Sequence, residues 1–90
     1  MIVIKNLLFK ETCSACPEQY DVFYNDRMVG YVRLRWGNLT AEYPACGGET
    51  IFEYTFENDD LKGCFDSNEE RMLYLNMIAN ALIIVINKKE

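Results

Sequence analysis

Residues 20–43 read YDVFYNDRMVGYVRLRWGNLTAEY, and this stretch decides the fold. Three segments that alternate polar and apolar residues are separated by two short polar turns, Asn25-Asp26 and Gly37-Asn38. Asn, Asp and Gly tolerate the positive φ that a two-residue β-hairpin turn demands. The stretch therefore predicts two consecutive hairpins that share their middle strand, which is an antiparallel meander.

These turn positions also assign each side chain to a face of the sheet, because alternate residues of a strand point to opposite sides. One predicted face is apolar and places Trp36 opposite Leu39. The other face is the Tyr/Val/Arg face, which carries Tyr20, Val22, Tyr24, Val29, Tyr31, Arg33 and Arg35. In this register Arg33 lies opposite Glu42, so a cross-strand ion pair is expected on the Tyr/Val/Arg face.

Further elements flank the meander. Residues 2–9 predict an N-terminal strand whose partner is undetermined, and residues 51–57 predict a strand after the meander. Ser67 with Glu70 three residues later is a capping box, which begins a helix. The chain is therefore predicted to form one α+β domain, residues 1–90: an antiparallel β-meander of four or five strands with one C-terminal helix packed across one face.

The predicted helix is apolar on two sides. A broad stripe suited to covering the apolar sheet face consists of Leu75, Ile78, Ala79, Leu82, Val85 and Ile86. A second stripe, on a different side, consists of Leu73, Met77, Ala81 and Ile84. We expect this second stripe to bind a protein partner or a second copy of the chain in a homodimer. Two alternatives are that residues 2–9 cover it, or that the helix ends near Asn80 and residues 82–86 form a strand, since β-branched residues favour strands.

Composition limits the function classes. Nine Lys and Arg against fourteen Asp and Glu give a net charge of −5, and the chain has no histidine. The acidic balance argues against tight, nonspecific nucleic-acid binding, because such binding depends on Lys and Arg. The absence of histidine excludes histidine-based acid–base catalysis. No apolar run is long enough to span a membrane and residues 1–6 do not resemble a secretory signal, so we expect a cytoplasmic location.

The chain has four cysteines, which a reducing cytosol would keep unpaired. The Cys13-x-x-Cys16 spacing can place two thiolates on one zinc ion, and Cys64 is expected at the same end of the sheet as a third ligand. Cys46 is expected at the opposite end. Free thiols without a metal are the competing interpretation.

These observations favour a small noncatalytic interaction or accessory protein rather than an enzyme. The predicted partner-binding residues come from the Tyr/Val/Arg face and the second helix stripe, and they are Tyr20, Tyr24, Tyr31, Arg33, Arg35, Leu73, Met77 and Ile84. The alternatives are a zinc-stabilised domain that uses Cys13, Cys16 and Cys64, and a small enzyme that works without histidine. Apart from zinc, no cofactor is expected.

Overall fold

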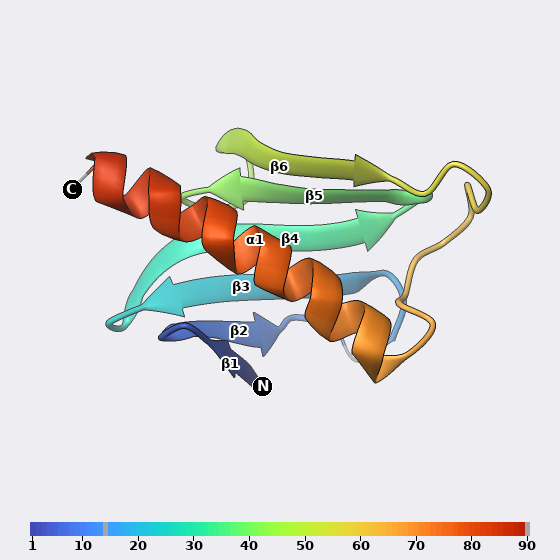
Figure 1. Ribbon diagram of the computed structural model, residues 1–90, viewed down its shortest axis with the longest axis horizontal. Helices are drawn as coiled ribbons and strands as arrows, with labels where there is room; N and C mark the ends of the chain where they lie inside the picture. The colour runs from blue at the N-terminus through green and yellow to red at the C-terminus, as the bar shows by residue number, and fades with distance from the viewer. Residues whose placement is uncertain (14, 90) are drawn as a thin grey trace.

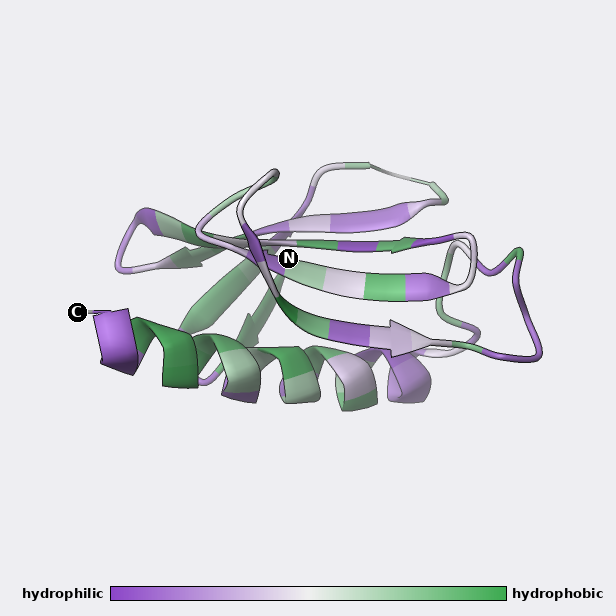
Figure 2. Cartoon of the chain, turned by 90° about the horizontal axis from the view of Figure 1, so that it is seen from above, coloured by the Kyte–Doolittle hydropathy of each residue, from purple (hydrophilic) through white to green (hydrophobic). Residues whose placement is uncertain are grey.

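The computed structural model describes residues 1–13 and 15–89, and in this part of the chain one helix covers one face of a six-stranded antiparallel sheet (Figure 1). The strands are neighbours in chain order: β1 (Ile2–Ile4), β2 (Leu7–Glu11), β3 (Glu18–Tyr24), β4 (Arg27–Arg35), β5 (Asn38–Tyr43) and β6 (Glu49–Thr55). Helix α1 (Asn68–Lys89) crosses the sheet diagonally, and Figure 2 shows it as a separate layer along one side. The predicted meander with a C-terminal helix is confirmed, although with six strands instead of four or five.

The additional strand comes from the N-terminus. The prediction of one strand over residues 2–9 is wrong, because Lys5 (φ 51°) and Asn6 (φ 68°) form a tight turn there. This turn pairs Ile4 with Leu7 and makes a hairpin of β1 and β2. Asparagine tolerates a positive φ, but the segment lacks the glycine that usually marks such a turn. The hairpin also gives the N-terminal strands their partners, since β2 pairs with β3.

The first predicted hairpin turn is confirmed, but the faces of β3 are not. Asn25 (φ 51°) and Asp26 (φ 65°) form the turn, and Phe23 lies opposite Met28 as expected. The register then shifts, and Val22 pairs with Gly30. The residue between Met28 and Gly30 is an extra one, which makes a β-bulge. Because the extra residue lies in β4, β3 is displaced by one residue relative to β4, and it presents Tyr20 and Val22 to the helix in place of Phe23.

The second hairpin turn begins one residue earlier than predicted. Trp36 (φ 54°) and Gly37 (φ 71°) form the turn, so Trp36 is not on the core face. Arg33 consequently lies opposite Thr40, and the predicted pairing of Arg33 with Glu42 is wrong. Glycine is required at position 37, because a Cβ there would lie 2.5 Å from the carbonyl oxygen of Asp59. That contact with a distant loop is a constraint that local sequence does not reveal.

The core lies between the sheet and α1. Five of the six residues of the broad helical stripe are in the core: Leu75, Ile78, Ala79 and Leu82 are fully buried, and Ile86 is nearly so, whereas Val85 is only partly buried. The helix approaches the sheet closely at Gly30, where an added Cβ would lie 3.2 Å from both methyl carbons of Leu82. A larger residue at position 30 would require the Leu82 side chain to move.

Helix α1 begins at the predicted signal and continues to Lys89. The Ser67 hydroxyl oxygen accepts a hydrogen bond from the Glu70 N–H (3.0 Å), and the Glu70 carboxylate accepts one from the Asp66 N–H (2.8 Å). Residues 82–86 are helical, so the strand alternative for them is wrong. Leu73, Met77 and Ile84 of the second stripe are exposed. In the described residues no helix has the length and apolar character needed to cross a bilayer.

Candidate functional site

The loop between β6 and α1, residues 56–67, folds back onto the end of the sheet where β3 begins. The Glu18 N–H donates to the Gly63 carbonyl (2.7 Å), and the Gly37 N–H donates to the Lys62 carbonyl (2.9 Å). A disulfide between Cys16 and Cys64 joins the loop to the chain just before β3, with 5.5 Å between the two Cα atoms. The expectation that these two cysteines are unpaired is therefore wrong.

The disulfide also removes two of the three predicted zinc ligands, Cys16 and Cys64. Zinc is bound by thiolate sulfur, whereas the sulfurs of Cys16 and Cys64 are bonded to each other. Cys13 is a partly buried free thiol and Cys46 is an exposed one. Within residues 1–13 and 15–89, no three Cys, Asp or Glu side chains are grouped so that they could hold a metal ion.

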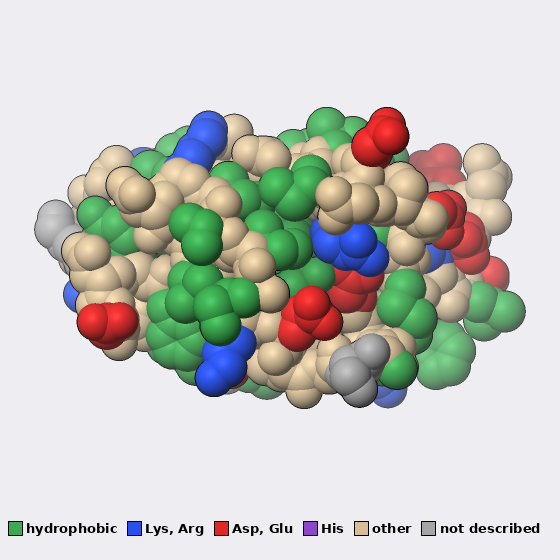
Figure 3. Space-filling view, turned by 90° about the horizontal axis from the view of Figure 1, so that it is seen from below, with side chains coloured by type: hydrophobic (Ala, Val, Ile, Leu, Met, Phe, Trp, Pro, Cys, Tyr) green, Lys and Arg blue, Asp and Glu red, His purple; other side chains and the backbone are tan. Residues whose placement is uncertain are grey.

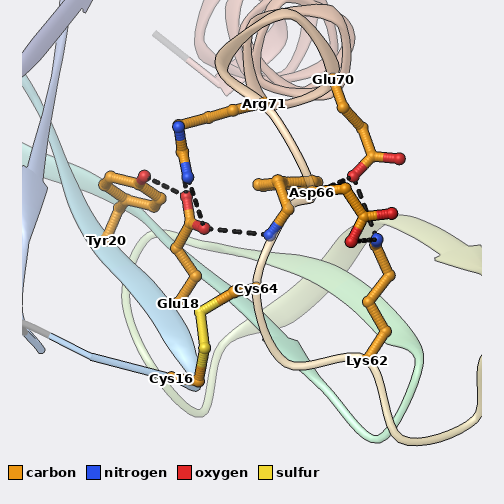
Figure 4. Close-up of a disulfide and its surroundings, with 9 residues drawn as sticks. Cys16, Glu18, Tyr20, Lys62, Cys64, Asp66, Glu70 and Arg71 are labelled. Carbon is orange, nitrogen blue, oxygen red and sulfur yellow. Dashed lines mark hydrogen bonds and ion pairs between the residues drawn. A yellow bond between two sulfur atoms is a disulfide. The ribbon is translucent and has the colours of Figure 1, made fainter.

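Next to the disulfide lies the Glu18 cluster, which consists of Glu18, Tyr20 and Arg71 (Figure 4). The buried Glu18 carboxylate accepts hydrogen bonds from Arg71 Nε (2.5 Å) and Nη2 (3.2 Å), from the Phe65 N–H (3.1 Å) and from the Tyr20 hydroxyl. The two bonds from Arg71 make a bidentate ion pair, which is the strongest geometry for this pair of groups. Four donors therefore hold one carboxylate at the base of the loop.

The pKa values in the Glu18 cluster reflect these bonds. Burial by itself would raise the pKa of Glu18, but the hydrogen bonds from Arg71, Tyr20 and Phe65 outweigh it and lower that pKa. Burial and the hydrogen bond to Glu18 together raise the pKa of Tyr20. The carboxylate is thus held charged and the phenol is held protonated, so this network is stable at neutral pH.

A second ion-pair group supports the same loop. The buried Lys62 ammonium lies 2.9 Å from Asp66 and 3.1 Å from Glu70 (Figure 4). Burial would lower the pKa of Lys62, but the two carboxylates raise it above its usual value. In the part of the chain that the structure describes, no buried side-chain nitrogen or oxygen lacks a hydrogen-bond partner. The polar groups under the loop are therefore satisfied by one another.

The structure divides the predicted Tyr/Val/Arg face between the two sides of the sheet. Tyr20 is only 1% exposed and belongs to the core, so its placement on an accessible surface is wrong. Tyr24 also lies on the helix side, where it lines a cavity together with Ile83 and Ile86 of α1. The bulge in β4 is the cause of this change of face. Tyr31 and the two arginines of β4 remain on the open face, which is the sheet face away from α1.

We call the end of β4 and the following turn the Trp36 corner, defined by Arg33, Arg35 and Trp36. A pocket of about 380 Å³ on the open face is lined by these three residues with Asn38 and Thr40. A second pocket, of about 430 Å³, is lined by Cys16, Pro17, Arg35, Trp36, Leu61 and Gly63. Arg35 and Trp36 line both pockets, so the indole and one guanidinium separate a polar pocket from a largely apolar one.

The side chains of the Trp36 corner are not satisfied by the fold. Trp36 is 65% exposed, and the Arg35 guanidinium lies 5.9 Å from the centre of its ring. Arg33 and Arg35 form no ion pair with any other residue in the described ranges. An exposed indole beside two unpaired guanidinium groups is suited to binding an anionic group that also carries an apolar part.

The backbone at Trp36 is also unusual, because this bulky residue has a positive φ of 54°. A bulky residue at positive φ is an outlier, and a residue in such a conformation costs about 1 kcal/mol or more. Asparagine or glycine at this turn position would avoid that cost and would expose less apolar surface. Neither the strain nor the exposure of Trp36 stabilises the fold, so the contacts in the described residues do not explain why a tryptophan occupies this position.

The sequence predicts the two arginines of this corner as surface residues but does not predict that Trp36 is exposed. The prediction put Trp36 in the core because it placed the turn at Gly37-Asn38. The signal that could have found it is the Trp36-Gly37 dipeptide itself, since glycine commonly occupies the second central position of a two-residue hairpin turn.

Comparisons of this chain with protein-family models, with curated proteins and with solved structures find no match. The chemistry of the site therefore has to indicate the function. The three side chains of the Trp36 corner bind anions and flat apolar groups, and a guanidinium does not exchange protons at neutral pH. This set of groups is suited to binding and not to acid–base chemistry.

Proposed function

We propose that this chain is a noncatalytic interaction domain whose binding surface is the Trp36 corner. One observation carries the proposal: a strained and exposed tryptophan stands beside two arginines that have no ion-pair partner in the described residues. Tyr31, which lies on the same strand and the same face, extends this surface along β4.

The partner that fits best is a short segment of another protein in which an acidic residue lies next to an apolar one. A carboxylate in the polar pocket would be bound by the two guanidinium groups. An adjacent apolar side chain would occupy the second pocket, against Pro17 and Leu61. The net charge of −5 disfavours a long polyanion such as nucleic acid, because the rest of the surface would repel it.

Fluorescence provides a direct test, because Trp36 is the one tryptophan of the chain. The probe is a synthetic peptide of alternating aspartate and leucine, and the matched control peptide has asparagine in place of aspartate. We expect the acidic peptide to change the Trp36 emission in a saturable way, and the control peptide to have little effect. Replacing one guanidinium should weaken binding by about ten- to a hundredfold, since a charge-assisted hydrogen bond contributes about 1.5–3 kcal/mol.

The variant for this test is Arg35→Gln, and Lys10→Gln is its matched control. Lys10 is an exposed cation on β2, so its replacement changes the net charge equally without touching the corner. Equal weakening by the two variants would show nonspecific attraction and would contradict the proposal. Tighter binding of a short oligonucleotide than of the acidic peptide would replace it with a nucleic-acid function.

Two further expectations from the sequence remain predictions. One is a homodimer through Leu73, Met77 and Ile84, which are exposed on α1. Sedimentation of the parent chain and of Met77→Glu tests it, and a parent that is monomeric at every concentration would contradict it. The other is a cytoplasmic location, which we continue to propose. Disulfides in that compartment are usually transient or redox-sensing, so we expect the Cys16–Cys64 disulfide to be of that kind.

A further inference from the structure

A third cysteine lies close to the disulfide. The Thr12 N–H donates to the Gln19 carbonyl (3.1 Å), so the chain after β2 still runs along β3. In the register of these two strands, where Glu11 is opposite Tyr20, the next positions place Cys13 opposite Glu18. The Glu18 carboxylate in turn accepts a hydrogen bond from the N–H that follows Cys64. Cys13 is therefore brought to the part of the fold where the disulfide is held.

Cys13 and Cys64 line the same cavity. This cavity, of about 390 Å³, is also lined by Glu18, Tyr20 and Arg71 and lies near Ile2 at the β1 edge of the sheet. Figure 3 views the molecule from that edge and shows acidic side chains gathered toward the end where the β6–α1 loop lies. Cys16, the other half of the disulfide, lines the apolar pocket beside Trp36 instead. The disulfide thus connects two cavities, and its Cys64 half shares one of them with a free thiol.

We propose that Cys13 and the Cys16–Cys64 disulfide undergo intramolecular thiol–disulfide exchange. The Cys13 thiol, which is partly exposed, gives its proton to water, and the thiolate attacks the sulfur of Cys64. A Cys13–Cys64 bond forms while the Cys16–Cys64 bond breaks, and Cys16 leaves as a thiolate that takes up a proton. One disulfide and one thiol are present before and after the step, so no external oxidant or reductant is needed.

The exchange moves a thiol from one cavity to the other. Before the step the free thiol is at Cys13, in the cavity of the Glu18 cluster. After it the free thiol is at Cys16, next to Pro17 and Trp36 in the apolar pocket. The β6–α1 loop stays tethered in both forms, but the tether moves three residues along the chain. The exchange itself does not depend on the proposed function. Any change that a free Cys16 thiol beside Trp36 makes to partner binding does rest on that proposal.

The test follows which cysteine is free. The oxidised full chain is incubated at pH 8 without oxygen, samples are taken over one day, and free thiols are blocked with N-ethylmaleimide at pH 6. The disulfide is then reduced and its thiols are labelled with a second reagent. Tandem mass spectrometry of the tryptic peptide of residues 11–27 shows whether the first label is on Cys13 or on Cys16.

We expect the first label to shift from Cys13 to Cys16 with time, at a rate that rises with pH and does not change on dilution. Cys46→Ser removes a cysteine that lies outside both cavities, and it should leave the shift unchanged. Cys13→Ser should abolish it, with Cys16 remaining unlabelled. A label that stays on Cys13 throughout would overturn the proposal, and so would a rate proportional to protein concentration. Peptide binding by the Trp36 corner is measured separately, so failure of either proposal is recognised without the other.

Discussion

The Glu18 cluster and the Trp36 corner lie at the same end of the sheet, and they differ in how completely the fold satisfies their polar groups. The Glu18 carboxylate is buried and accepts four hydrogen bonds. The guanidinium groups of Arg33 and Arg35 have no carboxylate partner in the described residues, and Trp36 is exposed at a strained backbone position.

This difference separates a group that maintains the structure from one that is available to a ligand. A buried charge is tolerated only when it is paired and hydrogen-bonded, so the contacts of Glu18 account for it fully. The contacts within the chain do not account for Trp36. Three changes test this division, and they are given from the largest expected effect to the smallest.

The largest effect is expected from Glu18→Ala. This change leaves the Arg71 guanidinium and the Tyr20 hydroxyl without their shared acceptor, and breaking a buried ion pair costs about 3–5 kcal/mol. Because one quarter of the Arg71 side chain is exposed to water, we expect a loss near the lower end, about 3 kcal/mol. Urea unfolding measures it. Glu57→Ala is the matched control in the exposed loop, and a loss below about 1 kcal/mol in Glu18→Ala would show that the cluster does not hold the loop.

A smaller effect is expected from acid. The pKa of Glu18 is lower in the folded protein than the ordinary value of 4.5, so the unfolded chain binds its proton first as the pH falls. The stability from this group is complete above about pH 4.5 and is lost as the pH falls through the folded pKa. Unfolding free energies between pH 6 and pH 3 should fall more steeply for the parent than for Glu18→Gln. Equal slopes would mean that Glu18 gains nothing from its partners on folding.

The smallest effect, and one of opposite sign, is expected from Trp36→Asn. Asparagine tolerates the positive φ of this turn position, so we expect stability to rise by about 0.5–1 kcal/mol while binding of the acidic peptide is lost. Circular dichroism during urea unfolding gives the stability, and calorimetry gives the binding, since the variant lacks the fluorophore. Trp36→Ala is the control, because it removes the indole but keeps a residue that disfavours positive φ. A loss of stability in Trp36→Asn would return the tryptophan to a structural role.

The sequence predicted the parts of the molecule that local patterns determine. The Asn25-Asp26 turn, the capping box at Ser67 and the buried stripe of α1 all depend on residues close together in the chain, and all three are present. The alternation along β4 is also local, and it placed Tyr31, Arg33 and Arg35 on the face opposite to the buried Val32 and Leu34.

The prediction of one strand over residues 2–9 missed a local turn at Lys5-Asn6 that has no glycine. Three other incorrect predictions concern features that distant residues determine. The choice of Trp36-Gly37 over Gly37-Asn38 as the turn fits the contact between Gly37 and the β6–α1 loop, which lies more than twenty residues farther along the chain. The bulge that buries Tyr20 pairs Val22 with Gly30, against which Leu82 of the helix packs closely. The Cys16–Cys64 disulfide joins positions 48 residues apart. The first two errors changed which side chains are accessible, Trp36 and Tyr20, and none of the three changed the order of the strands.

The arrangement of α1 has a consequence for the synthesis of the protein. All six strands pair with chain neighbours, so the sheet can assemble progressively as residues 2–55 leave the ribosome. Its apolar face is covered by α1, which packs against β1, β4 and β6 and follows all six strands in the chain. During that interval the nascent sheet exposes apolar surface and unprotected strand edges, which are the features that promote aggregation and recruit chaperones. Slow translation of residues 56–67 would lengthen the exposure, so the time between the last strand and the helix is the vulnerable period in the biogenesis of this fold.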